Sequence, residues 1–275
     1  MEQTKQVLKI KIHQSNAHYR VPFSYQRRFT YPIPPYSTVK GLICNLMGIK
    51  DEADKRLIKM REGLSLAIYG KYESLIKEYV WFRNLSQESH ISKFHSVTNR
   101  FIDNIPQHPG GQMPVTVDVL HNVNLIIYIY HSDEDFLKEI KDAFENPSNR
   151  LSIIHLGRSE DWVVFQEIKW PVELIQKSAM SINYFVWIPA KEYANKDFID
   201  EDYDNFFNEL NGNIFRLPTF YKITDSNQRV FDEYVTVKLY EGGSFKKTKF
   251  YVDPNENIPV IFSRLRGNED AKNPG

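Results

Sequence analysis

The residues with the clearest chemical potential in this 275-residue sequence are three arginines that stand among aromatic side chains. Arg20, Arg27 and Arg28 lie in residues 17–48, a segment without aspartate or glutamate. A guanidinium group can bind two phosphate oxygens at once or stack on a base. Nearby rings could also stack on bases (Tyr19, Phe23, Tyr25, Phe29, Tyr31). The segment is therefore predicted to bind a nucleic-acid backbone.

The charge distribution along the chain favours the same function. The first fifty residues contain eight lysines or arginines and one acidic residue, although the whole chain has 35 residues of each sign and no net charge. Such an uneven distribution attracts polyanions even when the pI is neutral. The amino-terminal part is therefore expected to carry a cationic surface.

A short helix is predicted directly after this segment. Apolar residues recur there at helical spacing (Val39, Leu42, Ile43, Leu46, Met47). Ser37 is expected to be the N-cap and Gly48 the C-terminal stop. The free N–H groups of the first turn could bind a phosphate, with Lys40 adding a full charge. A glycine inside a helix lowers its stability by about 1 kcal/mol relative to alanine. Gly41 would justify this cost if the backbone of a ligand came close to it. Alternatively, Gly41 packs against a strand and Lys40 is solvated.

Two further groups of residues are weaker candidates for contacts with RNA. Lys93, His95 and Arg100 lie in a polar arm over residues 84–114, which either contacts RNA or docks on a protein neighbour. His95 and Lys93 could instead form an acid–base pair for RNA cleavage. The turn at Arg158 either faces a phosphate or is merely a hairpin between two strands.

The pattern of elements that must position these residues predicts an α+β fold. The first strand is expected at 8–13 and the first helix at 37–47. A strand at 64–68 is followed by a turn at 70–74 and a second strand at 75–82, and then by the arm at 84–114. Strand segments at 115–130 and 150–170 flank a helix at 132–144. This is the order of a ferredoxin-like βαββαβ unit, the architecture of RNA-recognition domains. We expect residues 1–170 to form this domain and residues 171–275 a smaller, mostly β lobe.

Composition excludes several classes of protein. The chain is 41% hydrophobic and 25% charged, which is ordinary for a folded soluble protein. No apolar run is long enough to span a bilayer, and the amino terminus lacks the apolar core of a signal peptide. The single cysteine, Cys44, cannot form an intramolecular disulfide or a cysteine-based zinc site. We therefore expect a cytoplasmic protein that needs no metal or cofactor.

Three stretches of the sequence resemble a known family: AHYRVPFS, TYPIPPYSTVKGLICNLMGI and HLGRSEDWV. They are similar to the Cas-five family of CRISPR-associated proteins in its type I-B Cascade form, within the repeat-associated RNA-binding superfamily. The resemblance implies a non-catalytic subunit of an antiviral Cascade surveillance complex, which caps the 5′ handle of CRISPR RNA. Its partners would be the backbone and large subunits, and target DNA only indirectly, through pairing with the guide.

The resemblance also implies which residues face the handle (Tyr19, Arg20, Tyr31, Ser37, Thr38, Lys40, Gly41, Arg158). Some type I-C members also cut precursor RNA, whereas type I-B systems use a separate endonuclease, so the likeness argues against catalysis. Two alternatives stay open. The chain could be a metal-independent endoribonuclease that processes CRISPR repeat RNA, or a scaffold that contacts protein only.

Overall fold

A large, mostly antiparallel sheet dominates the computed structural model, which describes residues 5–22, 24, 27–84, 91–92, 95, 101–102, 105–106, 111–224 and 229–267. The main path of the sheet follows the order β12-β15-β11-β5-β9-β1-β10-β16-β17. Within the described residues, no helix is long and apolar enough to cross a membrane.

The predicted ferredoxin-like unit lies at the centre of this sheet. Its six elements are β1 (Lys5–Ala17), α1 (Tyr36–Met47), β5 (Ser65–Lys71), β9 (Gly111–Tyr130), α4 (Glu134–Glu145) and β10 (Val164–Ile182). The four strands lie in the order β10-β1-β9-β5 and are antiparallel to their neighbours. In β1, the alternating residues Leu8, Ile10 and Ile12 are fully buried. The fold prediction is therefore confirmed.

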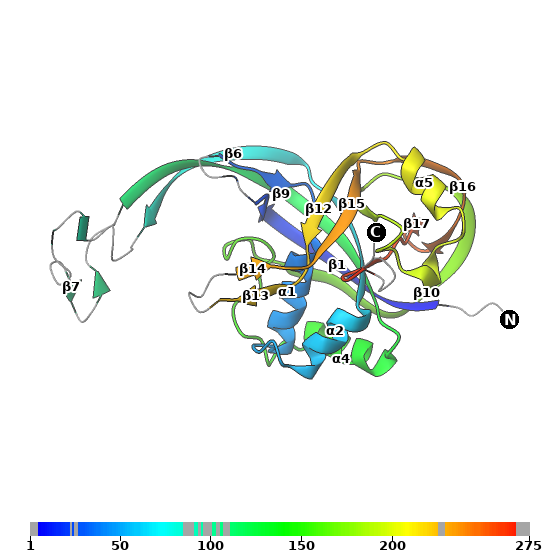
Figure 1. Cartoon of the computed structure of the whole chain (residues 1–275), viewed down its shortest axis with the longest axis horizontal. Coiled ribbons are helices and arrows are strands. Elements are labelled where there is room, and N and C mark those ends of the chain that lie inside the picture. Colours follow the sequence, from blue (N-terminus) through cyan, green and yellow to red (C-terminus); the bar gives the residue numbers. More distant parts are fainter. Residues whose placement is uncertain are drawn as a thin grey trace, which may run out of the picture.

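Helices α1, α2 (Lys55–Gly63) and α4 lie together on one side of the sheet (Figure 1). Gly48 ends α1 in the left-handed conformation, as predicted, with φ of 74°. The N-cap predicted at Ser37 is wrong by two residues, and the helix expected from residue 132 is capped one residue later. Pro35, held extended by its ring, precedes α1 in place of Ser37, and Asp133 caps α4 by accepting a hydrogen bond from the Phe136 N–H.

A long two-stranded ribbon projects from the body (Figure 1). It consists of β6 (Ser74–Asn84) paired with the first half of β9, from Ser74 opposite His121 to Asn84 opposite Gly111. Beyond its tip lie β7 (Phe101–Ile102) and β8 (Ile105–Pro106). The last four residues of the arm predicted at 84–114 thus belong to a strand, because β9 already starts at Gly111. Asn122, where β9 passes from body to ribbon, has a left-handed backbone with φ of 52°.

Strands of the carboxy-terminal part extend the same sheet at both edges. Beyond β5 lie β11 (Phe185–Pro189), β15 (Tyr234–Tyr240), β12 (Asn213–Pro218) and β18 (Ser263–Arg264), and beyond β10 lie β16 (Gly243–Asp253) and β17 (Ile258–Pro259). Two short helices also lie in this part of the chain, η1 (Lys196–Phe198) and α5 (Tyr203–Glu209). Residue 170, the expected domain boundary, falls inside β10, and the division into two lobes stays a prediction.

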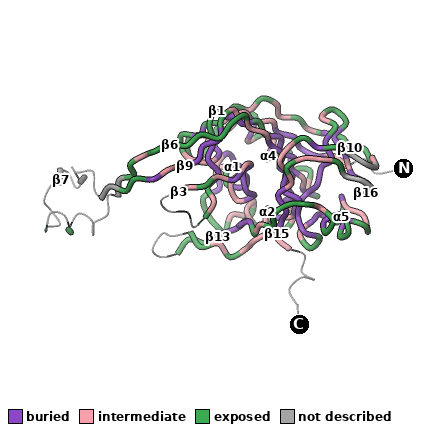
Figure 2. The backbone as a smooth tube through the Cα atoms, turned by 90° about the horizontal axis from the view of Figure 1, so that it is seen from above, coloured by how far each residue is buried: buried purple, intermediate pink, exposed green. Residues whose placement is uncertain are grey.

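Short elements complete the structure around α1. They are β2 (Tyr19–Arg20), β3 (Arg27–Arg28), β4 (Thr30–Tyr31), β13 (Tyr221–Ile223) and β14 (Arg229–Phe231). Residues 151–163, predicted as a strand and turn, form a loop with one bridge between His155 and Trp162. Buried segments are concentrated in the body, whereas much of the ribbon is exposed (Figure 2). Surfaces for a ligand are therefore expected around the ribbon base and the β13–β14 hairpin.

Candidate nucleic-acid interface

Two adjoining cavities lie at the start of α1. The larger one has a volume of about 960 Å³ and lies between the ribbon base, residues 18–31 and the loop at 157–160. The smaller one has about 430 Å³ and lies between α1 and the β13–β14 hairpin. Five residues line both cavities (Ser37, Thr38, Gly157, Arg229, Phe231). The two cavities are therefore contiguous, and we call them together the groove.

Two of the three predicted arginines line the larger cavity. Arg20 is exposed there, and the Arg28 guanidinium lies 3.8 Å from the centre of the Phe82 ring. The Arg28 Nε atom is buried and has no hydrogen-bond partner within the described part of the chain. Burial and the neighbouring charge of Arg20 lower the pKa of Arg28, but an arginine remains charged. The Arg28 guanidinium therefore lines the larger cavity as a cation without a carboxylate partner among the described residues, although its Nε atom itself is buried.

Arg27 faces a different surface from Arg28. Successive side chains of a strand point to opposite faces, and Arg27 and Arg28 are the two residues of β3. Arg27 stacks over Phe29 at 4.5 Å and lies 3.9 Å from Asp118. It lines neither cavity. The structure therefore separates Arg27 from the other two arginines of the predicted cluster.

Two of the predicted stacking rings belong to the core. Tyr19 is 1% exposed, and its hydroxyl donates a hydrogen bond to Gln14 Oε1 over 2.6 Å. Tyr31 packs edge-on against Trp187 with ring centres 5.6 Å apart. Both residues reach the cavity wall only from inside the core, so the expectation that their rings stack on bases is corrected.

The ribbon instead exposes rings that sequence reasoning passed over. Tyr79 and Trp81 are 64% and 58% exposed, with ring centres 6.1 Å apart. Trp81 and Phe82 also line the larger cavity. The signal available in the sequence was the run Tyr-Val-Trp-Phe at residues 79–82, which places large apolar side chains on both faces of one strand.

The first turn of α1 opens at the junction of the two cavities. The Thr38 and Val39 N–H groups both donate to the Pro35 carbonyl, over 3.0 and 3.3 Å. Neither an acidic residue nor a side-chain cap occupies this turn. The earlier N–H groups, of Tyr36 and Ser37, have no partner inside the helix, and the peptide dipoles place partial positive charge beside them. Ser37 and Thr38 thus lie where an anion would be stabilised.

The Lys40 side chain is buried, so it is not solvated and only a small part of it is accessible to a ligand. It is 4% exposed, and its Nζ atom lies 4.3 Å from the centre of the Phe220 ring and 5.1 Å from that of Tyr221. Burial lowers the pKa of Lys40. The side chain lines the smaller cavity. Lys40 is thus a buried cation between α1 and the hairpin, which differs from the two sequence-based alternatives.

Gly41 has no neighbour that requires a glycine. A Cβ atom built at this position meets nothing within 4 Å, so Gly41 does not pack against a strand. Alanine should therefore stabilise α1, and we expect Gly41→Ala to raise the free energy of unfolding by about 1 kcal/mol. Urea unfolding would measure this. A variant no more stable than the original chain would contradict this expectation.

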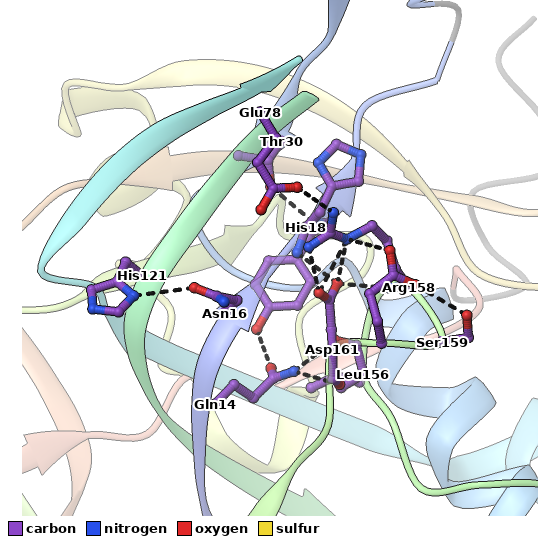
Figure 3. Close-up of polar contacts among 12 residues, drawn as sticks. Gln14, Asn16, His18, Thr30, Glu78, His121, Leu156, Arg158, Ser159 and Asp161 are labelled. Atoms are coloured by element: carbon purple, nitrogen blue, oxygen red, sulfur yellow. Dashed lines mark hydrogen bonds and ion pairs between the residues drawn. The ribbon is translucent and has the colours of Figure 1, made fainter. Parts of the chain in front are cut away.

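Arg158 is held in a network of carboxylates (Figure 3). Its Nη2 atom donates to Asp161 over 2.8 Å and its Nη1 atom to Glu78 over 3.0 Å, and Glu160 lies 3.4 Å away. Burial alone would lower the pKa of Arg158, but the hydrogen bonds and charges of Asp161 and Glu78 raise it overall. Carboxylates thus already occupy donors on all three guanidinium nitrogens of Arg158, and the prediction that Arg158 faces a phosphate stays a prediction.

His18 links this network to the first strands. Its backbone N–H donates to Asp161 Oδ2 over 2.9 Å, and its Nδ1 atom lies 2.7 Å from the Asp118 carbonyl oxygen. The Nε2 atom is buried and has no partner within the described residues. Burial lowers the pKa of His18, and burial likewise lowers the pKa of His131. Both imidazoles are therefore expected to be neutral at pH 7.

This burial predicts a pH dependence of stability. Below about pH 6.5 the unfolded chain binds protons at His18 and His131, whereas the folded chain does not until its lower pKa values are reached. The free energy of unfolding should therefore fall as the pH is lowered from about 6.5. Thermal unfolding at several pH values would measure this, and His18→Gln should weaken the dependence. An unchanged dependence in that variant would contradict the role given to His18.

Of the three candidate residues in the predicted arm, His95 is among the residues that the structure describes. His95 is exposed, and its N–H donates to the Ile91 carbonyl over 2.7 Å. Lys93 and Arg100 lie outside the described residues. The proposed pairing of Lys93 with His95 therefore stays a prediction.

Comparisons with solved structures found chains with similar folds, one of them at a TM-score of 0.50. A chain of a solved "CRISPR RNA-guided surveillance complex" is similar over 87% of this chain and 90% of its own, with 12% identity and a TM-score of 0.50. A CRISPR protein from Archaeoglobus fulgidus is similar over 94% of this chain and 100% of its own, with 14% identity and a TM-score of 0.43. At such identities, the first likeness shows the fold alone. The comparison with curated proteins found no match.

The family-level comparison is more specific. The model described as "CRISPR-associated protein (Cas_Cas5)" matches residues 7–184, more than half of the chain. This stretch contains nearly all of the ferredoxin-like unit, including α1 and the larger part of the groove. The chain therefore belongs to the Cas5 family of CRISPR-associated proteins.

Proposed function

We propose that the chain is a non-catalytic subunit of a CRISPR surveillance complex and that it holds the 5′ handle of CRISPR RNA in the groove. The observation that carries this proposal is the coincidence of two anion-binding features at one cavity. Arg28 lines the larger cavity without a carboxylate partner among the described residues, and the acid-free first turn of α1 opens into the same cavity. Family membership and the fold shared with a surveillance-complex chain support it.

The charges that line the larger cavity support an anionic ligand. Four arginines face it (Arg20, Arg28, Arg158, Arg229), with two glutamates (Glu78, Glu160). Both glutamates contact Arg158, which Asp161 also binds. The other three arginines have no carboxylate partner among the residues that the structure describes. A phosphate could therefore bind them without displacing an existing ion pair.

The aromatic lining favours single-stranded RNA over a duplex. Unpaired bases can stack on exposed rings, and such stacking depends little on sequence. Trp81 and Phe82 offer rings at the ribbon end of the larger cavity. We propose that phosphates follow the arginines and α1, while bases turn toward these rings.

The finer identity of the complex is also part of the proposal. We infer the type I-B Cascade form, in which the chain joins the backbone and large subunits and meets target DNA only through the guide. Such a complex would work in the cytoplasm. The ribbon and its tip, which project from the body, provide the surface for a neighbouring subunit.

The nucleic acid that co-purifies with the chain and its neighbours tests the proposed function. Sequencing should find short RNAs with variable interiors and one constant 5′ end. RNAs without a shared end, or no RNA at all, would contradict the proposal. A tagged chain purified after high-salt washing serves as the control, because phosphate contacts weaken as salt rises.

We also expect the purified chain to leave repeat RNA uncut. Of the histidines that line the groove, His18 has a buried Nε2 atom and His155 a buried Nδ1 atom. A general base must reach the proton that it removes. Gel analysis of repeat RNA with excess protein and no divalent metal would measure cleavage. Metal-independent cleavage that His95→Ala abolishes would instead establish the alternative, an endoribonuclease.

A further inference from the structure

The β13–β14 hairpin forms a wall of the groove, although it lies outside residues 7–184, which match the family model. Its strands pair with Tyr221 opposite Phe231 and Ile223 opposite Arg229. The residues of this face all line the groove (Tyr221, Ile223, Arg229, Phe231). Lys222 and Val230, which alternate with them, do not. One face of the hairpin therefore looks into the groove and the other looks outward.

Several contacts hold the hairpin beside α1. The Ile223 N–H donates to Glu52 Oε1 over 3.0 Å. At the base, Phe220 is buried, and the Arg61 Nε atom lies 3.3 Å from Glu233 Oε1. The hairpin and the ribbon project from the same end of the body in both views (Figures 1 and 2). The hairpin is thus positioned as a wall opposite the ribbon base.

A buried ammonium group between α1 and the hairpin points to an anionic ligand. Lys40 is 4% exposed and lines the smaller cavity, and within the described residues it has ring contacts but no ion pair or hydrogen bond. Burying an unpaired charge is costly unless an opposite charge approaches. The two acids that line this cavity are already engaged, since Asp51 accepts from the Ala53 N–H and Glu52 from the Ile223 N–H.

Arg229 lies where the two cavities meet. It lines both of them, as do Ser37 and Thr38 of the first turn of α1. Its guanidinium lies 4.9 Å from the centre of the Tyr221 ring. Stacking of this kind orients the planar group while its edge donors remain open to a phosphate.

We propose that the β13–β14 hairpin is the second wall of the RNA-binding groove and that Arg229 binds a backbone phosphate at the junction of the cavities. Lys40 and the α1 first turn add positive charge to the same phosphate site. This inference rests on the proposed function and extends it to a carboxy-terminal element. The ligand is a phosphodiester of single-stranded RNA.

Lys222 provides a matched control, because it is a cation on the outer face of the same hairpin. The probe is fluorescent oligouridylate, and anisotropy measures its affinity for the full chain at several salt concentrations. Arg229→Gln should weaken binding roughly tenfold and reduce the salt slope by about 0.7, which corresponds to one lost phosphate contact on a single strand. Lys222→Gln should change neither quantity. Equal effects of the two variants would overturn the proposal.

An Arg28→Gln variant separates this inference from the proposed function. If oligouridylate binds, Arg28→Gln weakens it and Arg229→Gln does not, the hairpin proposal alone is wrong. If the original chain does not bind, or neither arginine matters, the proposed function fails as well. Arg229 is exposed, and melting curves of each variant verify that the fold is retained. Photo-crosslinking of the probe to Tyr221 or Phe231 would support the hairpin as a wall.

Discussion

Replacing Asp161 by alanine should lower the free energy of unfolding by about 3–5 kcal/mol, because breaking a buried ion pair leaves the remaining charge uncompensated. The Asp161 carboxylate is fully buried, binds two nitrogens of the Arg158 guanidinium, and accepts the N–H groups of His18 and Arg158. Its loss would remove the hydrogen bond from the His18 N–H that helps to hold the loop at 157–160 beside the first strands. Urea unfolding followed by circular dichroism measures the change.

Glu160 offers a matched comparison for this prediction. It is a second carboxylate beside Arg158, 3.4 Å away, but its side chain is 62% exposed. Exposed ion pairs contribute about 0–1 kcal/mol, so Glu160→Ala should leave stability nearly unchanged. Similar losses in both variants would show that burial of Asp161 does not decide the strength of this network.

Replacing Arg28 by glutamate should weaken RNA binding by roughly a hundredfold, since a hydrogen bond to a charged group is worth up to about 3 kcal/mol. The variant removes a guanidinium that lines the larger cavity and puts a negative charge beside Arg20. It also removes the guanidinium that stacks on Phe82. Fluorescence anisotropy with the RNA that co-purifies with the complex would measure the loss.

Arg27→Glu is the natural control, because it makes the same change in net charge one residue away. Arg27 lines neither cavity and stacks on Phe29 instead. Its reversal should therefore weaken binding far less and change mainly the salt dependence through the general field. Equal losses in the two variants would mean that the basic segment acts only through its total charge, without a phosphate site at Arg28.

The sequence predicted the fold better than the site, for a physical reason. Periodicity reports which residues share a face, and this was enough for β1, α1 and α4. Helix α2 was missed because it is dominated by charged residues and buries only Met60. Composition does not report distant partners, so Tyr31 could not be matched to Trp187, which is 156 positions away.

Some contacts of the candidate site residues are made with neighbours in the sequence, and others with residues far along the chain. The acids next to Arg158 are visible in the run Gly-Arg-Ser-Glu-Asp at 157–161 and could have indicated an internal ion pair. In contrast, the position of Arg229 beside α1 depends on a hairpin almost two hundred residues further along the chain. A basic, aromatic segment thus located the surface, while the tertiary fold decided which of its side chains a ligand can reach.

The left-handed backbone at Asn122 has a mechanical consequence for the arm. Asparagine tolerates this conformation better than most residues, and its side-chain amide donates to Glu73 Oε2 over 2.9 Å. Strand β9 runs without interruption from Tyr130 into the ribbon. A change of a few degrees in the backbone torsion angles at Asn122 therefore displaces the far end of the ribbon more than the residues next to Asn122. Torsion angles at this one position, where β9 leaves the body, therefore influence the direction in which the ribbon points.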